Sequence, residues 1–142
     1  MEKDFILNRR ITIRAPASKV WNAITNPELT KKYMYNSEVI SDWKTGCDIL
    51  WRDADNKKVH VKGFIVNIVP GSYLQTKDLS LDAGLPDSEE NYSRVAYELK
   101  SGDPETVLSV TEDNFNGDER RYGDADKFWD TVLKNMKKLL EE

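Results

Sequence analysis

A chain of 142 residues, 39% of them hydrophobic and 32% charged, is long enough to form one water-soluble domain with its own core. The net charge of −4 and the lack of a basic stripe argue against a nucleic-acid groove, and no apolar run approaches the roughly 18 residues of a membrane span. The first residues lack the apolar core of a signal peptide and Cys47 is the single cysteine, which together indicate a reducing, cytoplasmic setting.

The N-terminal part predicts one strand and two short helices. Residues 5–14 end in alternating apolar and polar residues, which is typical of a half-buried strand. Pro16 suits the first position of a helix, because the N–H that it lacks would be unpaired there. That helix ends at Asn26-Pro27, since the residue before a proline resists the helical conformation. Pro27 then opens a second short helix, so we expect a V-shaped pair.

From residue 36 onward the pattern is typical of strands joined by turns. We expect strands over residues 37–41, 48–53, 58–69, 73–78, 92–100 and 106–115. Their short connections imply antiparallel pairing, because a parallel pair needs a crossover of about a dozen residues. Gly63 inside a strand indicates a bulge or a close approach. The acid-rich residues 79–91 predict a mobile loop, either a lid over a site or, as we favour, a solvated loop.

The stretch from Asp124 to the C-terminus predicts one long amphipathic helix after a polar connection at residues 116–123. Its apolar residues recur at helical spacing: Ala125, Phe128, Trp129, Val132, Leu133, Met136, Leu139 and Leu140. Because so broad an apolar face needs a large cover, the expected fold is α+β. An antiparallel sheet of six to seven strands curves around this helix in a single domain, residues 1–142.

Four stretches resemble the START-like, or SRPBCC, superfamily. Residues 13–29 (IRAPASKVWNAITNPEL) are similar to its opening, and residues 41–46, 63–70 and 93–99 agree with it in the same order. Within the superfamily the chain looks most like homologues of the C-terminal domain of the activator of the heat-shock-protein-90 ATPase. The resemblance implies the helix-grip fold of birch-pollen-allergen-like proteins, a curved sheet around a long C-terminal helix. It also implies a cavity for hydrophobic ligands, and chaperone binding in those members that are co-chaperones.

Few residues indicate catalysis. His60 is the only histidine, and a lone histidine in a strand is more often a wall or surface residue than a base. The usual zinc ligands are too few, and no glycine-rich phosphate loop is present. We therefore expect no catalytic residues, no metal and no cofactor. A cavity enzyme, a cyclase or hydrolase that uses His60 and Asp78, is kept as the third alternative.

The residues expected on inward faces define a candidate cavity between the final helix and the sheet. They are Tyr33, Met34, Trp51, Thr76, Asp78, Tyr97, Phe128, Trp129, Val132 and Leu133. The aromatic ones could equally fill the core. A buried unpaired carboxylate is costly, so Asp78 either reaches the exposed end of its strand, which we favour, or serves a ligand. The leading hypothesis is a non-enzymatic protein that binds a small hydrophobic molecule. The alternative is a protein-interaction module whose partner is a heat-shock chaperone.

Overall fold

A computed structural model describes residues 5–102 and 104–142. The elements are β1 (Leu7–Ile13), α1 (Ala17–Thr25), α2 (Pro27–Tyr33), β2 (Ser37–Ser41), β3 (Asp48–Asp53), β4 (Val59–Val69), β5 (Tyr73–Ser80), the 3-10 helix η1 (Glu89–Asn91), β6 (Ser93–Gly102), β7 (Glu105–Asp113) and α3 (Glu119–Glu141). Within these residues, seven strands form one antiparallel sheet in the order β1-β7-β6-β5-β4-β3-β2.

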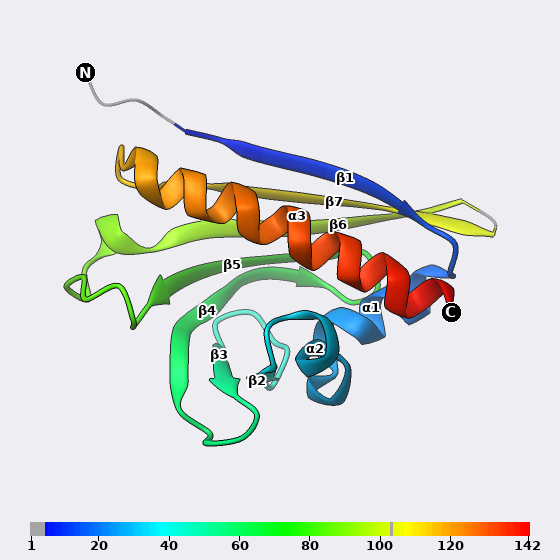
Figure 1. The fold of residues 1–142 in the computed structure, drawn as a ribbon, viewed down its shortest axis with the longest axis horizontal. Helices are drawn as coiled ribbons and strands as arrows, with labels where there is room; N and C mark the ends of the chain where they lie inside the picture. The colour runs from blue at the N-terminus through cyan, green and yellow to red at the C-terminus, as the bar shows by residue number, and fades with distance from the viewer. Residues whose placement is uncertain (1–4, 103) are drawn as a thin grey trace.

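The sheet curves around α3, which lies across its inner face (Figure 1). β1 completes one edge by pairing with β7, with Ile11 opposite Leu108, and β2 forms the other edge. The helices α1 and α2 lie beside the C-terminal half of α3 and pack against it (Figure 1). This is the predicted helix-grip arrangement, so the fold class derived from the sequence is confirmed.

The helix pair follows from the two prolines. Pro16 occupies the N-cap of α1, one residue before the predicted position, and Pro27 is the first residue of α2. Between the helices, Asn26 adopts an extended conformation, and its side chain accepts a hydrogen bond of 3.0 Å from the backbone N–H of Glu28. Asn26 thereby ends one helix and caps the next.

The long helix begins five residues earlier than the sequence predicts. Asp118 is its N-cap, and Oδ1 accepts hydrogen bonds from the backbone N–H groups of Arg120 and Arg121 at 3.0 and 3.2 Å. An aspartate cap contributes about 1 kcal/mol, which offsets the cost of about 1 kcal/mol for Gly123 inside the helix. The predicted polar connection at residues 116–123 is therefore wrong over residues 119–123, which belong to α3.

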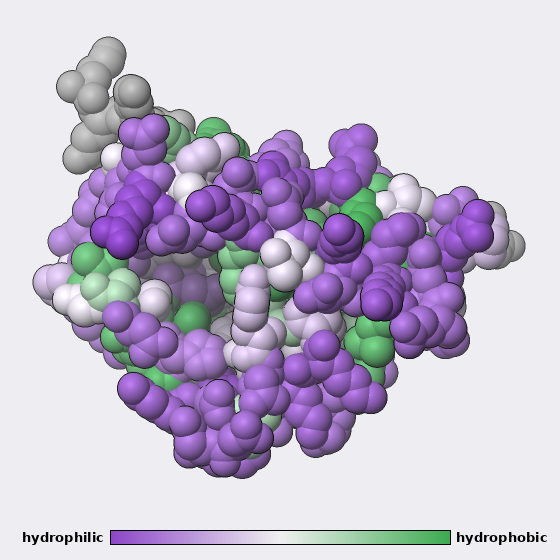
Figure 2. All heavy atoms as spheres, in the orientation of Figure 1, coloured by the Kyte–Doolittle hydropathy of each residue, from purple (hydrophilic) through white to green (hydrophobic). Residues whose placement is uncertain are grey.

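The core lies between α3 and the inner face of the sheet. Its most buried side chains include Leu7, Ile13, Ile65, Leu74, Leu108, Val110, Val132 and Met136. The face shown in Figure 2 is mostly hydrophilic and is hollowed beneath the N-terminal half of α3. No helix in the described part of the chain is long and apolar enough to cross a membrane.

Candidate functional site

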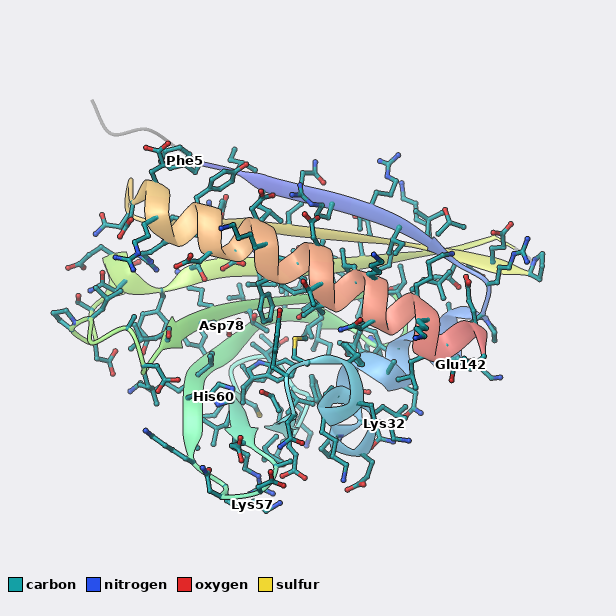
Figure 3. The ribbon with its side chains drawn as sticks, in the orientation of Figure 1. Phe5, Lys32, Lys57, His60, Asp78 and Glu142 are labelled. Carbon is teal, nitrogen blue, oxygen red and sulfur yellow. The ribbon has the colours of Figure 1, made fainter. Side chains whose placement is uncertain are left out.

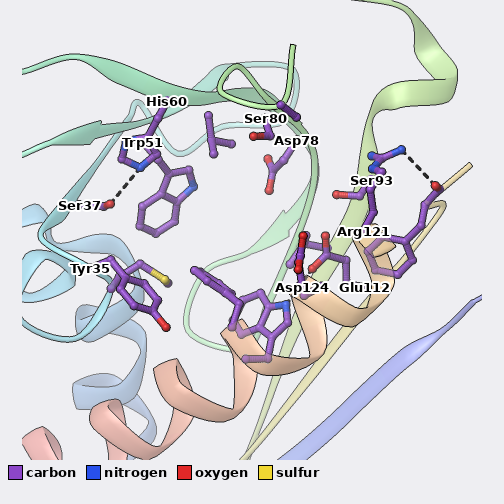
Figure 4. Close-up of a pocket in the computed structure, with 18 of the residues that line it drawn as sticks. Tyr35, Ser37, Trp51, His60, Asp78, Ser80, Ser93, Glu112, Arg121 and Asp124 are labelled. Atoms are coloured by element: carbon purple, nitrogen blue, oxygen red, sulfur yellow. Dashed lines mark hydrogen bonds between the residues drawn. The ribbon is translucent and has the colours of Figure 1, made fainter. Parts of the chain in front are cut away.

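A cavity of about 500 Å³ lies between the N-terminal half of α3 and the inner face of the sheet (Figure 4). Its apolar wall consists of Met34, Tyr35, Trp51, Val61, Ala83, Leu85, Val95, Tyr97, Phe115, Ala125, Phe128 and Trp129. These side chains come from strands, from α3, from the α2–β2 and β7–α3 connections and from the segment between β5 and η1. The volume lies in the range of about 300–1,000 Å³ that is typical of small-molecule sites.

Aromatic rings form a continuous wall from the mouth of the cavity inward. Tyr35 stacks on Phe128 at 5.5 Å between ring centroids. Phe128 in turn meets Trp129 edge-on at 5.2 Å, and Trp129 meets Tyr97 edge-on at 5.8 Å. Tyr35 is 60% exposed, whereas Trp129 and Tyr97 are buried. Such edge-to-face and stacked pairs fix the rings, so the wall is preformed.

Asp78 of β5 lines this cavity, and Figure 3 shows it beneath α3, with His60 farther from the helix on β4. Its Oδ2 accepts a hydrogen bond from Thr76 Oγ1 at 3.2 Å. Its Oδ1 is buried and has no hydrogen-bond partner among residues 5–102 and 104–142. Burial, and then the negative charge of Glu112, raise the pKa of Asp78 to about 7, although the Thr76 hydroxyl opposes the rise.

The position that we favoured for Asp78, at an exposed strand end, is therefore wrong. The physical reason is that β5 continues to Ser80, two residues beyond the predicted end. The segment that follows contributes Ala83 and Leu85 to the same cavity. The carboxylate thus lies inside the fold, where an unpaired oxygen is costly.

Glu112 of β7 is the second carboxylate of the cavity. Its Oε1 accepts a hydrogen bond of 2.8 Å from the indole N–H of Trp129, which joins the sheet to α3. Burial raises the pKa of Glu112, and the bond from Trp129 opposes that rise. Arg121 also lines the cavity, but its guanidinium donates to the backbone carbonyls of Phe115 and Asn91, at 3.1 and 2.9 Å.

A second polar group lies on the other side of the cavity. His60 Nε2 and Ser37 Oγ are 3.0 Å apart, and both residues line the cavity (Figure 4). A histidine that activates a serine needs a third group on its other ring nitrogen. Among the described residues no hydrogen bond to that nitrogen is found, and the pair forms a polar patch of the wall. The part of the chain that the structure describes also contains no cluster of three or more histidine, cysteine or acidic side chains that could hold a metal ion.

The structure brings part of the predicted site together. Met34, Trp51, Asp78, Tyr97, Phe128 and Trp129 line the cavity. Tyr33, Thr76, Val132 and Leu133 are buried and are not among the lining residues. Tyr33 points away, because its hydroxyl donates to the carbonyl of Ala23 at 2.6 Å and closes the helix pair. Val132 and Leu133 follow Trp129 towards the C-terminal half of α3, where α1 and α2 fill the space.

Two polar residues of the site were missed although the sequence contains their signal. Glu112 follows the inward-facing Val110 by two positions, and Ser93 precedes the inward-facing Val95 by two. Strict alternation along a strand therefore places both on the cavity face. Arg121 carried no such signal, because its position depends on the true start of α3.

The comparisons with known proteins agree with this architecture. The family model described as Activator of Hsp90 ATPase homolog 1-like protein matches residues 14–141. A solution structure of a protein from Cytophaga hutchinsonii is 37% identical, with a TM-score of 0.81, and the match covers 99% of this chain and 97% of that one. A comparison with curated proteins finds no match.

Two further solved structures share the fold at lower identity. The Aha1 dimer from Colwellia psychrerythraea is 19% identical with a TM-score of 0.76, and the match covers 96% of each chain. An HSP90 activator from Plasmodium falciparum is 18% identical with a TM-score of 0.77, and the match covers 95% of each chain.

Proposed function

The chain belongs to the family of Activator of Hsp90 ATPase homolog 1-like proteins, and we propose that it binds a small, largely apolar molecule in the cavity beneath α3. The observation that carries the proposal is the cavity itself, about 500 Å³ in volume and walled mainly by apolar and aromatic side chains. Protein interiors are close-packed and hold few voids larger than a water molecule. A space of this size is therefore unusual for a purely structural core.

The polar end of the cavity explains why the walls do not collapse onto one another. Asp78 and Glu112 reach it from β5 and β7. An apolar side chain that moved against either carboxylate would remove it from water without supplying a hydrogen bond. The apolar rings opposite them consequently keep a surface that an occupant covers, at about 25 cal/mol per Å² buried.

Two features border the opening that we propose for the cavity, the exposed ring of Tyr35 and the segment of residues 81–88. Tyr35 stands there, 60% exposed, stacked on Phe128. Residues 81–88 supply Ala83 and Leu85 to the wall. This segment is held at its far end because Asp87 pairs with Lys62 and accepts a hydrogen bond of 2.6 Å from the hydroxyl of Tyr92. We infer that an occupant enters between Tyr35 and this segment.

A neutral dye tests the proposal. N-phenyl-1-naphthylamine, whose fluorescence rises in apolar surroundings, should bind the wild-type protein saturably. Ala125→Phe places a ring inside the cavity and should weaken binding by about tenfold or more through steric overlap. The matched control is Ala96→Phe, because Ala96 lies on the outer face of β6 and should leave binding unchanged. Absence of saturable binding, or equal loss in both variants, would contradict the proposal.

A second candidate function is an interaction with a chaperone of the Hsp90 class, and the observation that favours it is the family match over residues 14–141. Its test is the ATPase rate of the chaperone with and without added protein. Stimulation would support the interaction, and an unchanged rate would end it. Ala125→Phe in the same assay separates the two functions, because a surface interaction does not depend on an open cavity.

A further inference from the structure

The charged groups of the cavity are unbalanced. Asp78, Glu112 and Asp124 contribute carboxylates to its lining, and Figure 4 shows them on the same side. The cation beside them is Arg121, whose guanidinium donates to two backbone carbonyls and whose charge partly balances that of Glu112, because it lowers the pKa of Glu112. In the described residues neither Asp78 nor Glu112 forms an ion pair. His60, the other basic lining residue, lies on the opposite side with Ser37.

Asp78 is the carboxylate with one oxygen that lacks a hydrogen-bond partner among the described residues. An ionised carboxylate offers about four acceptor sites, and here the Thr76 hydroxyl supplies one long hydrogen bond of 3.2 Å. Oδ1 is buried and receives none in the part of the chain that the structure describes. Glu112 differs, because the indole N–H of Trp129 already donates to it at 2.8 Å. Oδ1 packs against Gly63, and of the two carboxylates Asp78 is therefore the one with fewer donors.

Three classes of occupant can be compared on these contacts. A fatty acid or other anion would bring like charge against Asp78 and Glu112, which is unfavourable at short range. A neutral alcohol would supply a donor but would leave the excess negative charge uncompensated. A protonated amine supplies both the hydrogen bond and the opposite charge, and charge-assisted hydrogen bonds are about twice as strong as neutral ones. The aromatic wall also suits a cation, because ring faces attract positive charge.

We propose that the occupant of this cavity is an apolar, amine-bearing molecule whose ammonium group lies against the carboxylate of Asp78. The inference rests on the proposed function, since it names the chemical class of the ligand for the same cavity. The apolar part of the molecule contacts Trp51, Phe128 and Trp129, and Glu112 adds negative charge without being the direct partner.

Three probes that share one ring system test the inference. They are 2-(naphthalen-1-yl)ethylamine, 2-(naphthalen-1-yl)ethanol and naphthalen-1-ylacetic acid. Titrations are followed by calorimetry near pH 8, where the pKa of Asp78, about 7, leaves its carboxylate ionised. The wild-type protein should bind the amine about tenfold more tightly than the alcohol, and the acid most weakly.

The variant Asp78→Asn keeps the shape of the side chain and removes its charge. It should weaken amine binding about tenfold and leave alcohol binding within about twofold. The control is Asp130→Asn, because Asp130 lies on the exposed side of α3, pairs with Arg9, and does not line the cavity. This control should change neither affinity.

The failure of this inference differs from the failure of the proposed function. Equal affinities of the wild-type protein for the amine and the alcohol would contradict the inference of an amine-bearing ligand. The proposed binding of an apolar molecule in the cavity would still stand. An equal loss of affinity for the amine and the alcohol in the Asp78→Asn variant would also contradict the inference of an amine-bearing ligand. If none of the three probes binds, both the inference and the proposed function fall.

Discussion

Gly63 leaves the space that the carboxylate of Asp78 occupies. The two residues lie opposite each other on β4 and β5, and a Cβ atom on Gly63 would come within 2.5 Å of Asp78 Oδ1. It would come closer still to the carbonyl oxygen of Lys77. The glycine that interrupts the β4 sequence is therefore required by the close approach of the neighbouring strand and of the acidic group of the cavity.

The first prediction concerns this contact. Gly63→Ala should destabilise the fold by about 2–4 kcal/mol, because the clash involves backbone that must shift. Gly123→Ala is the matched control: its Cβ would meet nothing within 4 Å, and alanine in a helix interior stabilises by about 0.5–1 kcal/mol. Urea unfolding measures both free energies of unfolding. Similar stability of the Gly63→Ala variant and the wild-type protein would contradict the packing described.

The second prediction is a pH dependence of stability. In the unfolded chain Asp78 ionises near its ordinary pKa of 3.8, and in the fold near 7. Between these values the folded state keeps a proton that the unfolded state has lost, so the cost of Asp78 grows as the pH rises from about 4 to about 7. At about 1.4 kcal/mol for each tenfold change in proton affinity, the full cost is about 4 kcal/mol at most.

Asp78→Asn should therefore stabilise the protein by about 2 kcal/mol or more near pH 8 and by less than about 1 kcal/mol near pH 4. The comparison is made by urea unfolding of the two proteins at both pH values, so that the titration of all other groups cancels. A stabilisation that does not depend on pH would mean that the carboxylate is not buried as described.

The third prediction concerns the bond between Trp129 and Glu112. Trp129→Phe removes the donor and leaves a buried carboxylate acceptor, which should cost about 1–3 kcal/mol. In a double-mutant cycle with Glu112→Leu, the coupling energy should be about 1 kcal/mol or more. Additive effects of the two substitutions would show that the bond contributes nothing to stability.

The fourth prediction concerns the tether of residues 81–88. Tyr92→Phe deletes the hydroxyl that donates to Asp87 at 2.6 Å, so this segment should open more often. Amide hydrogen exchange in residues 81–88 should become faster, while global stability changes by about 1 kcal/mol or less. The control is Tyr73→Phe, which removes a tyrosine hydroxyl at the start of β5, away from Asp87. It should leave amide exchange in residues 81–88 unchanged. Equal exchange rates in the Tyr92 variant and the wild-type protein would contradict the tether.

Most of the fold could be predicted from the sequence, because the local signals for strands, helix ends and the long helix agreed with one another. Strand alternation, the prolines at positions 16 and 27, and the period of the final helix together predicted the order and pairing of the elements. The start of α3 was misplaced because Gly123 and the polar residues before it indicate a connection. The cap at Asp118 overrides that local preference.

The site was less predictable for a different reason. Periodicity says which face a residue occupies, and it placed Trp51, Tyr97 and Trp129 inward. It does not say where the helix and sheet separate, so it could not divide the cavity residues from core residues such as Val132. The burial of Asp78 depends on the segment after β5, whose course has no periodic signal.

The most direct test of the cavity as a binding site uses the four tryptophans of the chain. Trp51 and Trp129 line the cavity, whereas Trp21 and Trp43 do not. In ¹H–¹⁵N spectra recorded during titration with the neutral dye N-phenyl-1-naphthylamine, the indole N–H signals of Trp51 and Trp129 should shift saturably with one dissociation constant. Those of Trp21 and Trp43 should stay in place. Four unchanged signals, or shifts confined to Trp21 and Trp43, would contradict a ligand site between α3 and the sheet.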